Sequence, residues 1–311
     1  MAERVLVTGV LGCVGAWVAA AVLDDGDEVV GYDPGSNTSR LELVLGERAR
    51  AVDLVAGDVT DLAELERALD THEVTRVVHL AGLQVPFCRE DPPLGVSVNV
   101  VGTVNVLEAV RRRRDRIPGV VYASSAAVYG PSDPSPAPEA AAGTPATLYG
   151  VTKAANEGTA RIFWHENGVA SIGIRPYVVY GPGRDQGLTS GPTRAMQAAA
   201  RGEGFRIGFG GAAQYDYAPD VGRAFVTAAH AVADGAIVGN YPGVLASMAE
   251  VVAAIETAVP DVNGRITWDE APLPFPPELE ATALEHALGQ VPHTPLAEGV
   301  AATIAAFRAY G

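Results

Sequence analysis

The sequence predicts an α/β protein with a doubly wound, Rossmann-like parallel sheet and a smaller, interleaved C-terminal lobe for the substrate. Three observations carry this prediction. Short β-branched runs alternate with helix-like segments through roughly the first 175 residues, which is the pattern of βαβ units. A strand, a glycine-rich loop, a helix and a second strand open the chain between Val5 and Asp33. The regular alternation then breaks down from Pro176 onward.

Six apolar runs are predicted as strands, and most of the segments between them as helices. The strands are expected at Val5–Val7, Glu28–Tyr32, Ala51–Ala56, Arg76–Leu80, Val120–Ser124 and Ser171–Arg175. The helices are expected at Ala16–Leu23, Leu62–Asp70, Gly95–Arg113, Leu148–Asn167, Pro192–Arg201, Asp220–Ala233, Ser247–Ala258 and Leu296–Tyr310. The Pro131–Pro145 segment, rich in Pro, Ala and Ser, is expected as a loop over the carboxyl edge of the sheet, where ligands of such sheets bind.

Gly9, Gly12 and Gly15 lie in the loop between the first strand and its helix, with the spacing Gly-x-x-Gly-x-x-Gly. In this setting the first glycine permits a tight turn, the second lets the backbone approach a pyrophosphate, and the third lets the helix pack on the sheet. The amides at the start of that helix face the phosphates. The sequence therefore predicts a dinucleotide site.

Asp33 ends the second strand and selects between the two dinucleotides. Its carboxylate can accept both hydroxyls of an adenosine ribose, and it repels a 2′-phosphate. NAD is favoured over NADP, and Arg40 is close enough in sequence to keep NADP as the alternative. Asp33 can also simply start the turn 33–37, and the two roles are compatible.

The length of 311 residues suggests one large domain or two interleaved ones. Residues 1–176 are predicted to form the NAD-binding core, with 212–236 returning to it. Residues 177–211 and 237–311 are predicted to form the smaller substrate-binding lobe. We expect this lobe to close over the reactive end of the cofactor.

Composition disfavours several classes of partner. The net charge of −15 argues against nucleic acid and anionic membranes, and no apolar run is expected to reach membrane-spanning length. The first strand follows Met1–Arg4 at once, which leaves no room for a signal peptide. Cys13 and Cys88 give no disulfide framework and no metal-ligand spacing. We expect a cytoplasmic protein without a metal, and we interpret Arg111–Arg114 as a solvated helix end.

Tyr149 and Lys153 are four residues apart, so they share one face of their helix. A nearby ammonium favours the ionised phenol and is expected to lower the tyrosine pKa from about 10. Such a phenol can take a proton from an alcohol while hydride leaves the same carbon. Ser124 and Ser125 end a buried strand upstream, where a hydroxyl can hold the substrate alcohol. Taken singly, each motif is more often surface packing or a strand cap.

Together these residues resemble the extended short-chain dehydrogenases/reductases, the family of NAD-dependent epimerases and dehydratases. The resemblance covers nearly the whole chain. It rests on Thr8–Gly15, Gly57–Val59, His79–Gly82, Asn99–Glu108, Ser124–Gly130, Tyr149–Lys153, Arg175–Pro176 and Tyr180–Gly183. It implies a carbohydrate-like small-molecule substrate. It also implies a homodimer in which the helices of Asn99 and Tyr149 from two subunits form a four-helix bundle.

The resemblance also implies roles for individual residues. Ser125 matches the catalytic Ser/Thr, Tyr149 the base and Lys153 the ribose-binding partner. The implied cofactor contacts are Gly9, Leu11, Gly12, Val14, Gly15, Asp33, Asp58, Val59, Leu80, Ala81, Gly82, Asn99, Ala123, Tyr149, Lys153 and Pro176. The expected substrate contacts are Gln84, Ser125, Ala126, Tyr149, Tyr177 and Arg184.

Two departures from the family pattern narrow the chemistry. Ala126 and Ala127 replace the Asp-Glu pair of the sugar-nucleotide dehydratases and the Glu of the decarboxylases. Methyl groups cannot move protons, which argues against both reactions. The arginines that clamp a diphosphate in nucleotide-sugar members are also missing from their usual places. Because arginine is the natural clamp for phosphate, a diphosphate would need Arg184, Arg194 or Arg206.

Three functions remain open. The first is an NAD-dependent epimerase that oxidises a sugar or sugar-like hydroxyl to a ketone and reduces it from the other face. The second is an NAD-dependent dehydrogenase of a non-nucleotide sugar, polyol or hydroxy acid. The third is a non-catalytic NAD-sensing protein, which would be expected to have lost Tyr149 or Lys153. Nearby, His79 is predicted to be a satisfied core histidine, and Cys88 to be packed and inert.

Overall fold

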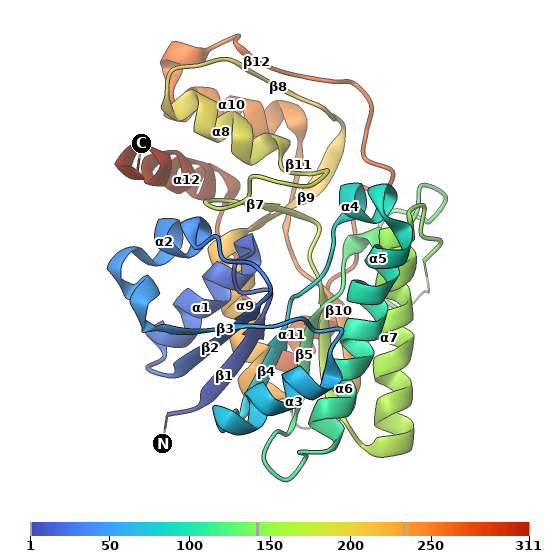
Figure 1. Cartoon of the computed structure of the whole chain (residues 1–311). Helices are drawn as coiled ribbons and strands as arrows, with labels where there is room; N and C mark the ends of the chain where they lie inside the picture. Colours follow the sequence, from blue (N-terminus) through green and yellow to red (C-terminus); the bar gives the residue numbers. More distant parts are fainter. Residues whose placement is uncertain (1, 141–142, 233, 311) are drawn as a thin grey trace.

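A computed structural model confirms the predicted fold class (Figure 1). It describes residues 2–140, 143–232 and 234–310, so residues 141–142 of the predicted loop and Ala233 of the predicted helix lie outside the described residues. A seven-stranded parallel sheet has the strand order β10-β6-β5-β4-β1-β2-β3. Its strands are β1 (Arg4–Thr8), β2 (Glu28–Asp33), β3 (Val52–Ala56), β4 (Arg76–His79), β5 (Gly119–Ala123), β6 (Ala170–Arg175) and β10 (Ala236–Asn240).

The strand order reverses direction at β1, which has β2 on one side and β4 on the other. The connection from β1 to β2 and the connection from β3 to β4 therefore leave the sheet in opposite directions. In open α/β sheets this reversal creates a crevice at the carboxyl ends of the strands, and ligands bind there. Both predicted motifs, the glycine loop and the end of β5, lie at this edge.

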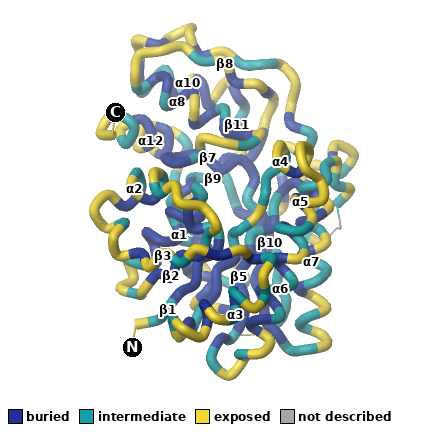
Figure 2. Tube along the Cα trace, in the orientation of Figure 1, coloured by how far each residue is buried: buried dark blue, intermediate teal, exposed yellow. Residues whose placement is uncertain are grey.

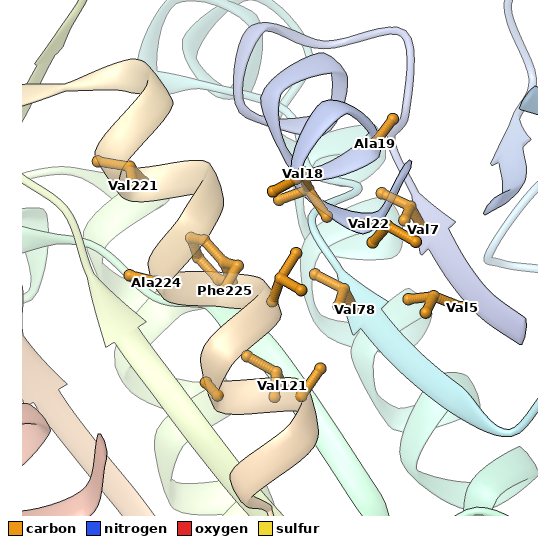
Figure 3. Close-up of a cluster of buried hydrophobic side chains, with 14 of the residues drawn as sticks. Val5, Val7, Val18, Ala19, Val22, Val78, Val121, Val221, Ala224 and Phe225 are labelled. Carbon is orange, nitrogen blue, oxygen red and sulfur yellow. The ribbon is translucent and has the colours of Figure 1, made fainter. Parts of the chain in front are cut away.

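Helices cover both faces of the sheet, and the strands supply apolar residues to each face in alternation. Val5, Val7 and Val121 pack against α1 (Cys13–Asp24) and α9 (Ala218–Ala231), as Figure 3 shows. Leu6 and Val120 belong to the opposite cluster, together with residues of α3 (Leu62–Thr71), α6 (Gly102–Arg111) and α7 (Leu148–Asn167). The central strands are consequently buried through the middle of the molecule, whereas the edge strand β3 is largely exposed (Figure 2).

The predicted helix Gly95–Arg113 has a different internal structure. It consists of α5 (Pro92–Val96), a π-helical turn at Ser97–Val101 and α6. Such π turns inside helices often mark functional sites, and this one carries Asn99. Pro92–Arg111 is also long and apolar enough, by length and composition only, to cross a membrane. The expectation that no segment would reach that length was wrong; here the segment packs against α7 as part of the fold.

The C-terminal lobe contains two small sheets and three covering helices. One sheet has the order β11-β9-β7, and β8 pairs with β12 in the other. Its elements are β7 (Val178–Tyr180), α8 (Gly191–Ala200), β8 (Phe205–Ile207), β9 (Ala212–Tyr217), β11 (Val244–Ser247), α10 (Met248–Ala258), β12 (Ile266–Trp268) and α12 (Leu296–Tyr310). Between them the chain returns to the main sheet through α9 and β10. The domain boundaries stay a prediction.

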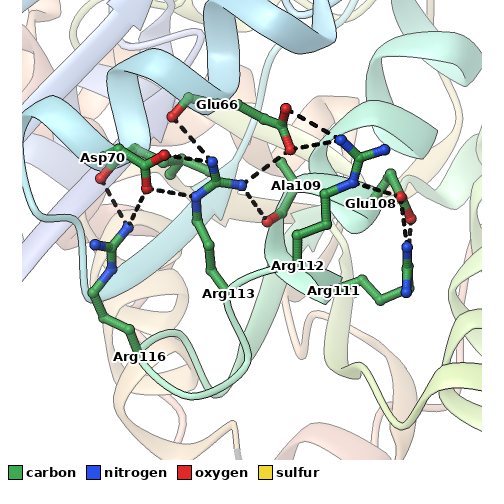
Figure 4. Close-up of polar contacts among 9 residues, drawn as sticks. Glu66, Asp70, Glu108, Ala109, Arg111, Arg112, Arg113 and Arg116 are labelled. Carbon is green, nitrogen blue, oxygen red and sulfur yellow. Dashed lines mark hydrogen bonds and ion pairs between the residues drawn. The ribbon is translucent and has the colours of Figure 1, made fainter.

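Three arginines of the run at the end of α6, Arg111, Arg112 and Arg113, pair with acids of α3 and α6 (Figure 4). Arg112 and Arg113 contact Glu66, and Arg113 also contacts Asp70 at 2.6 Å. Glu108 pairs with Arg111 and Arg112 within its own helix. These ion pairs join two helices on one face of the sheet. The arginine run therefore stabilises the packing of α3 against the end of α6.

Candidate active site

A cavity of about 790 Å³ lies at the carboxyl edge of the sheet, between the core and the C-terminal lobe. It is lined from the glycine loop, from the segments that follow β2 to β6, from α7 and from the loop between β7 and α8. All three predicted catalytic residues line it, as do all predicted substrate contacts. All predicted cofactor contacts except Asn99 line it too. The individual roles stay predictions.

The glycine loop has the close approaches that its spacing predicts. Gly9 has a φ of +72°, and a Cβ atom there would lie 2.8 Å from the backbone nitrogen of Ala81. A Cβ atom on Gly15 would lie 2.3 Å from the carbonyl oxygen of Gly9. Gly12 is the N-cap of α1 and provides no side-chain cap. The amides at the start of α1 are therefore available for a pyrophosphate, and the loop fits that group.

Asp33 both starts the turn and faces the cavity, so the two interpretations of this residue hold together. Its carboxylate accepts the amide of Gly35 at 2.9 Å and the amide of Leu11 at 3.2 Å. Arg40 has protein partners for its guanidinium, because its Nη2 pairs with Asp185 at 2.8 Å and its Nη1 donates to the Leu11 carbonyl at 3.1 Å. This geometry fits NAD better than NADP.

Lys153 is almost completely buried, at 4% exposure. Its Nζ donates to the carbonyl oxygen of Ala123 at 2.8 Å, and a Cβ atom on Gly82 would lie 3.4 Å from it. Burial lowers the pKa of Lys153 to about 8, and the neighbouring Cys88 and Glu157 act in the opposite direction. The ammonium thus sits between the ends of β4 and β5, beside the predicted nicotinamide side of the site.

The expectation of a lowered Tyr149 pKa was wrong for the protein without its cofactor. Burial raises the pKa of the Tyr149 phenol, and the Ser125 hydroxyl and the Arg184 guanidinium reverse only part of this rise. The Nζ of Lys153 lies 5.6 Å from the centre of the phenol ring. Desolvation of the phenolate outweighs the nearby cations. At neutral pH Tyr149 is therefore a proton donor.

The two serines at the end of β5 differ in their partners. Ser125 begins a short 3₁₀ turn, where its Oγ accepts the amide of Ala127 at 3.1 Å. Ser124 is buried and donates to the carboxylate of Glu157, which forms two 2.7 Å hydrogen bonds with Arg175. The Ser124 hydroxyl is thus already used in a hydrogen bond to a buried ion pair. The Ser125 hydroxyl lies beside Tyr149 instead.

Asn99 does not reach the cavity, although it was predicted as a cofactor contact. Its side chain accepts the amide of Leu83 at 2.7 Å, donates to the Leu83 carbonyl at 3.0 Å and donates to Thr152 at 3.1 Å. It therefore connects the loop after β4 to α7 without lining the cavity. Asn99 belongs to the π-helical turn Ser97–Val101.

His79 and Cys88 behave as predicted. The two ring nitrogens of His79 lie 2.7 Å from the Thr8 hydroxyl and 3.0 Å from the Thr103 hydroxyl. Burial lowers the His79 pKa to about 3. Cys88 is buried, its thiol donates to the Leu83 carbonyl at 3.2 Å, and burial raises its pKa. Both are satisfied core residues.

Several lining residues were missed by sequence reasoning. The turn after Asp33 could have been found, because Pro34–Asn37 follows the acid directly. Phe275 had a signal too, since it lies in the apolar and proline-rich run Leu273–Pro277; its ring meets the ring of Tyr177 edge-on, with 6.0 Å between the centroids. Further missed lining residues include several from short elements with weak periodicity: Val85, Phe87, Leu94, Val98, Gln186, Leu188 and Thr189.

Comparison with known sequences places this geometry among related enzymes. The sequence pattern of the NAD dependent epimerase/dehydratase family matches residues 5–241. The chain is 32% identical to a UDP-glucose 4-epimerase of Mycolicibacterium smegmatis over 98% of both chains. It is 37% identical to UDP-glucuronate 4-epimerase 1 of Arabidopsis thaliana, over 57% of this chain and 43% of that protein. The chain thus spans less than half the length of that plant relative.

Two solved structures share the fold over almost the whole chain. A UDP-glucose 4-epimerase from Brucella ovis in complex with NAD superposes with a TM-score of 0.81 at 25% identity, covering 99% of both chains. A partial consensus L-threonine 3-dehydrogenase has a TM-score of 0.85 at 24% identity, covering 99% of this chain and 100% of that one. The same fold therefore occurs in proteins described as an epimerase and as a dehydrogenase, and fold alone does not separate these reactions.

The roles of Asp33 and Asp185 can be tested by substitution. Asp33→Asn should weaken NAD binding by about 10-fold or more, since a charged hydrogen bond is worth about 1.5–3 kcal/mol. It should not by itself create NADP binding, because Arg40 stays paired with Asp185. The double variant Asp33→Asn with Asp185→Asn frees Arg40 and should bind NADP more tightly than the single variant. Calorimetric titration with both dinucleotides measures this. Equal NADP affinity in the single and double variants would contradict it.

Proposed function

The chain belongs to the NAD dependent epimerase/dehydratase family, and we propose from this premise that it is an NAD-dependent epimerase of a sugar or sugar-like substrate. The observation that carries the proposal is the convergence of Ser125, Tyr149 and Lys153 on the same cavity as the glycine loop and Asp33. This set serves transient oxidation of a hydroxyl to a ketone and its reduction from the other face. A non-catalytic NAD sensor would have no use for it.

Each residue has a defined task in this reaction. Bound NAD supplies the hydride acceptor and, in the return step, the hydride donor. Oxidation requires Tyr149 in its phenolate form, which is the minor form in the protein without its cofactor because burial raises the pKa of the phenol. The phenolate oxygen accepts the proton of the substrate hydroxyl during oxidation, and the resulting phenol returns it to the ketone oxygen during reduction. Ser125 donates a hydrogen bond to that same substrate oxygen. Lys153, held at the Ala123 carbonyl, supplies a cation and hydrogen-bond donors for the ribose next to Tyr149.

Ala126 and Ala127 support a reaction that consists of hydride transfer alone, without elimination of water. Both residues are buried and line the cavity directly after Ser125. Their methyl groups offer neither acid nor base at the place where water elimination or decarboxylation would need one. Dehydratase and decarboxylase chemistry are therefore disfavoured by the same two positions that the sequence singles out.

The alternative is an NAD-dependent dehydrogenase acting on a non-nucleotide sugar, polyol or hydroxy acid. One observation favours it: among the described residues that line the cavity, the arginines are Arg40 and Arg184. Arg40 is already paired with Asp185. Arg194 lies over the ring of Phe205, and Arg206 pairs with Asp269 on the surface. A diphosphate clamp of two arginines is therefore not formed around this cavity.

Retention of the cofactor separates the two functions. An epimerase regenerates NAD within each turnover, so we expect near-stoichiometric NAD in the supernatant of the purified protein after denaturation, measured by chromatography. A protein that is purified empty and binds NAD weakly and reversibly would favour the dehydrogenase. Failure to bind NAD in any form would overturn both.

Tyr149→Phe removes the proton-transfer atom and keeps the ring. We expect kcat to fall by about 100-fold or more, with the bound or titrated NAD content unchanged. Activity would be followed as inversion of a sugar by NMR if NAD is retained, and as NADH absorbance if it is not. Ala127→Ser, which also changes one side chain of the lining, serves as the matched control and should keep most of the activity. Wild-type turnover in Tyr149→Phe would contradict the assignment.

We also propose that the protein is a cytoplasmic homodimer that does not bind nucleic acid or membranes. The dimer is supported by large apolar side chains exposed on the helices of the predicted bundle. Val101 is 45% exposed, and Val151 and Ile162 of α7 are 49% and 43% exposed. The free thiols of Cys13 and Cys88 are consistent with a reducing compartment, and the pairing of the arginine run leaves little free cationic surface for nucleic acid.

Light scattering tests the dimer. The native protein should have twice the chain mass, and Val151→Glu should have a single chain mass, because a buried, unpaired charge opposes association. Leu245→Glu is the control, since Leu245 is equally exposed, at 46%, but lies on β11 in the other lobe. It should remain dimeric. A monomeric wild-type protein at micromolar concentration would contradict the proposal.

A further inference from the structure

Arg184 lines the cavity with neutral partners only. Its Nη2 donates to the Thr189 hydroxyl at 3.1 Å, and its Nη1 donates to the Gln84 side-chain oxygen at 3.4 Å. Its Nε is buried and has no hydrogen-bond partner among the described residues. The adjacent acid, Asp185, is paired with Arg40 instead. A guanidinium that lines a cavity and has only neutral partners among the described residues is suited to a carboxylate or phosphate.

Arg184 lines the same cavity as the proton-transfer residue Tyr149. Burial raises the pKa of the Tyr149 phenol, and the positive charge of Arg184 acts in the opposite direction. Gly187 leaves space for the Arg184–Gln84 contact, because a Cβ atom there would collide with the Gln84 side-chain oxygen and lie 3.2 Å from Nη2 of Arg184. The loop between β7 and α8 thus supplies one cation to the cavity that contains Tyr149.

The same end of the cavity has an apolar rim. Phe87, Leu94 and Leu188 are 38%, 49% and 45% exposed, and all three line the cavity. They come from α4 (Val85–Glu90), α5 and the loop that carries Arg184, and Phe275 continues the apolar lining from the C-terminal lobe. Exposed large apolar side chains gathered around a pocket mark the place where an apolar part of a ligand is buried.

We propose that this end of the cavity binds a hydroxy acid with an apolar substituent. Its carboxylate pairs with Arg184, its hydroxyl meets Tyr149, and its apolar group packs on Phe87, Leu94 and Leu188. This substrate class rests on the proposed NAD-dependent oxidation at Tyr149, and it belongs to the dehydrogenase alternative, whose substrates include hydroxy acids. A nucleoside diphosphate is disfavoured, because one guanidinium would have to hold two phosphates against an apolar wall.

Binding without turnover tests this assignment. Three probes, 3-phenyllactate, its uncharged amide 3-phenyllactamide, and lactate, are titrated calorimetrically into the NAD-saturated protein. We expect 3-phenyllactate to bind at least about 10-fold more tightly than either of the others, since each lacks one of the two features. Arg184→Gln should remove the advantage over the amide, and Leu188→Asn should reduce the advantage over lactate. Arg184→Lys should restore only part of the affinity, because it keeps the charge and loses the planar fork.

A bound anion has a second possible source in the pyrophosphate of the cofactor, so the NAD affinity of Arg184→Gln is measured in parallel. Unchanged NAD affinity together with lost discrimination between acid and amide supports the proposal. Loss of NAD affinity assigns Arg184 to the cofactor and overturns it. Equal binding of acid and amide by the wild-type protein overturns it as well, as does tighter binding of UDP-glucose than of 3-phenyllactate. None of these readouts depends on catalysis, so they are distinct from failure of the proposed oxidation.

Discussion

Burial of the Lys153 ammonium is the constraint on which the rest of the site depends. A cation at 4% exposure is tolerated only where polar groups face it, and here the Ala123 carbonyl at the end of β5 takes its hydrogen bond. That contact fixes α7 against the carboxyl edge of the sheet and so fixes Tyr149 one turn earlier. On the other side, Gly82 lies beside the ammonium, since a Cβ atom there would be 3.4 Å from Nζ. The predicted cofactor side and the proton-transfer group are therefore positioned by one buried charge.

A second buried network makes this arrangement rigid from behind. Ser124, at the end of β5, bonds to Glu157 of α7, and Glu157 holds Arg175 at the end of β6. Arg175 then donates to the Tyr129 hydroxyl at 2.7 Å. Removing one partner of such a buried pair costs about 3–5 kcal/mol, because the other charge is left uncompensated. Ser125 follows β5 and Tyr177 follows β6. The ends of these two strands are thus fixed against α7 by a buried ion pair as well as by packing.

Much of the fold and part of the candidate site could be predicted from the sequence. The strands, the glycine loop and Asp33 could be predicted because each follows from a local rule on periodicity or backbone space, and Leu148–Asn167 has the predicted bounds. Properties that depend on the burial of a side chain could not be predicted from the sequence. Tyr149 was expected to have a lowered pKa because Lys153 is its neighbour on one helix face, yet desolvation raises that pKa. Asn99 was placed in the cofactor site, whereas the π turn holds it one layer behind. Arg40 and Asp185 meet across 145 positions in the chain, a contact that no local pattern indicates.

The measurement that tests the account most directly is the pKa of Lys153. It is the only lysine in the sequence, so protein labelled with ¹³C at the lysine Cε gives a single NMR signal to titrate. The account predicts a midpoint at about 8 in the folded protein, against an ordinary value of 10.5. The unfolded chain then binds more protons between these two pH values, so this residue makes the free energy of unfolding rise with pH across that window. A midpoint near 10.5 would mean that the ammonium is solvated, and it would contradict the buried site described for Lys153.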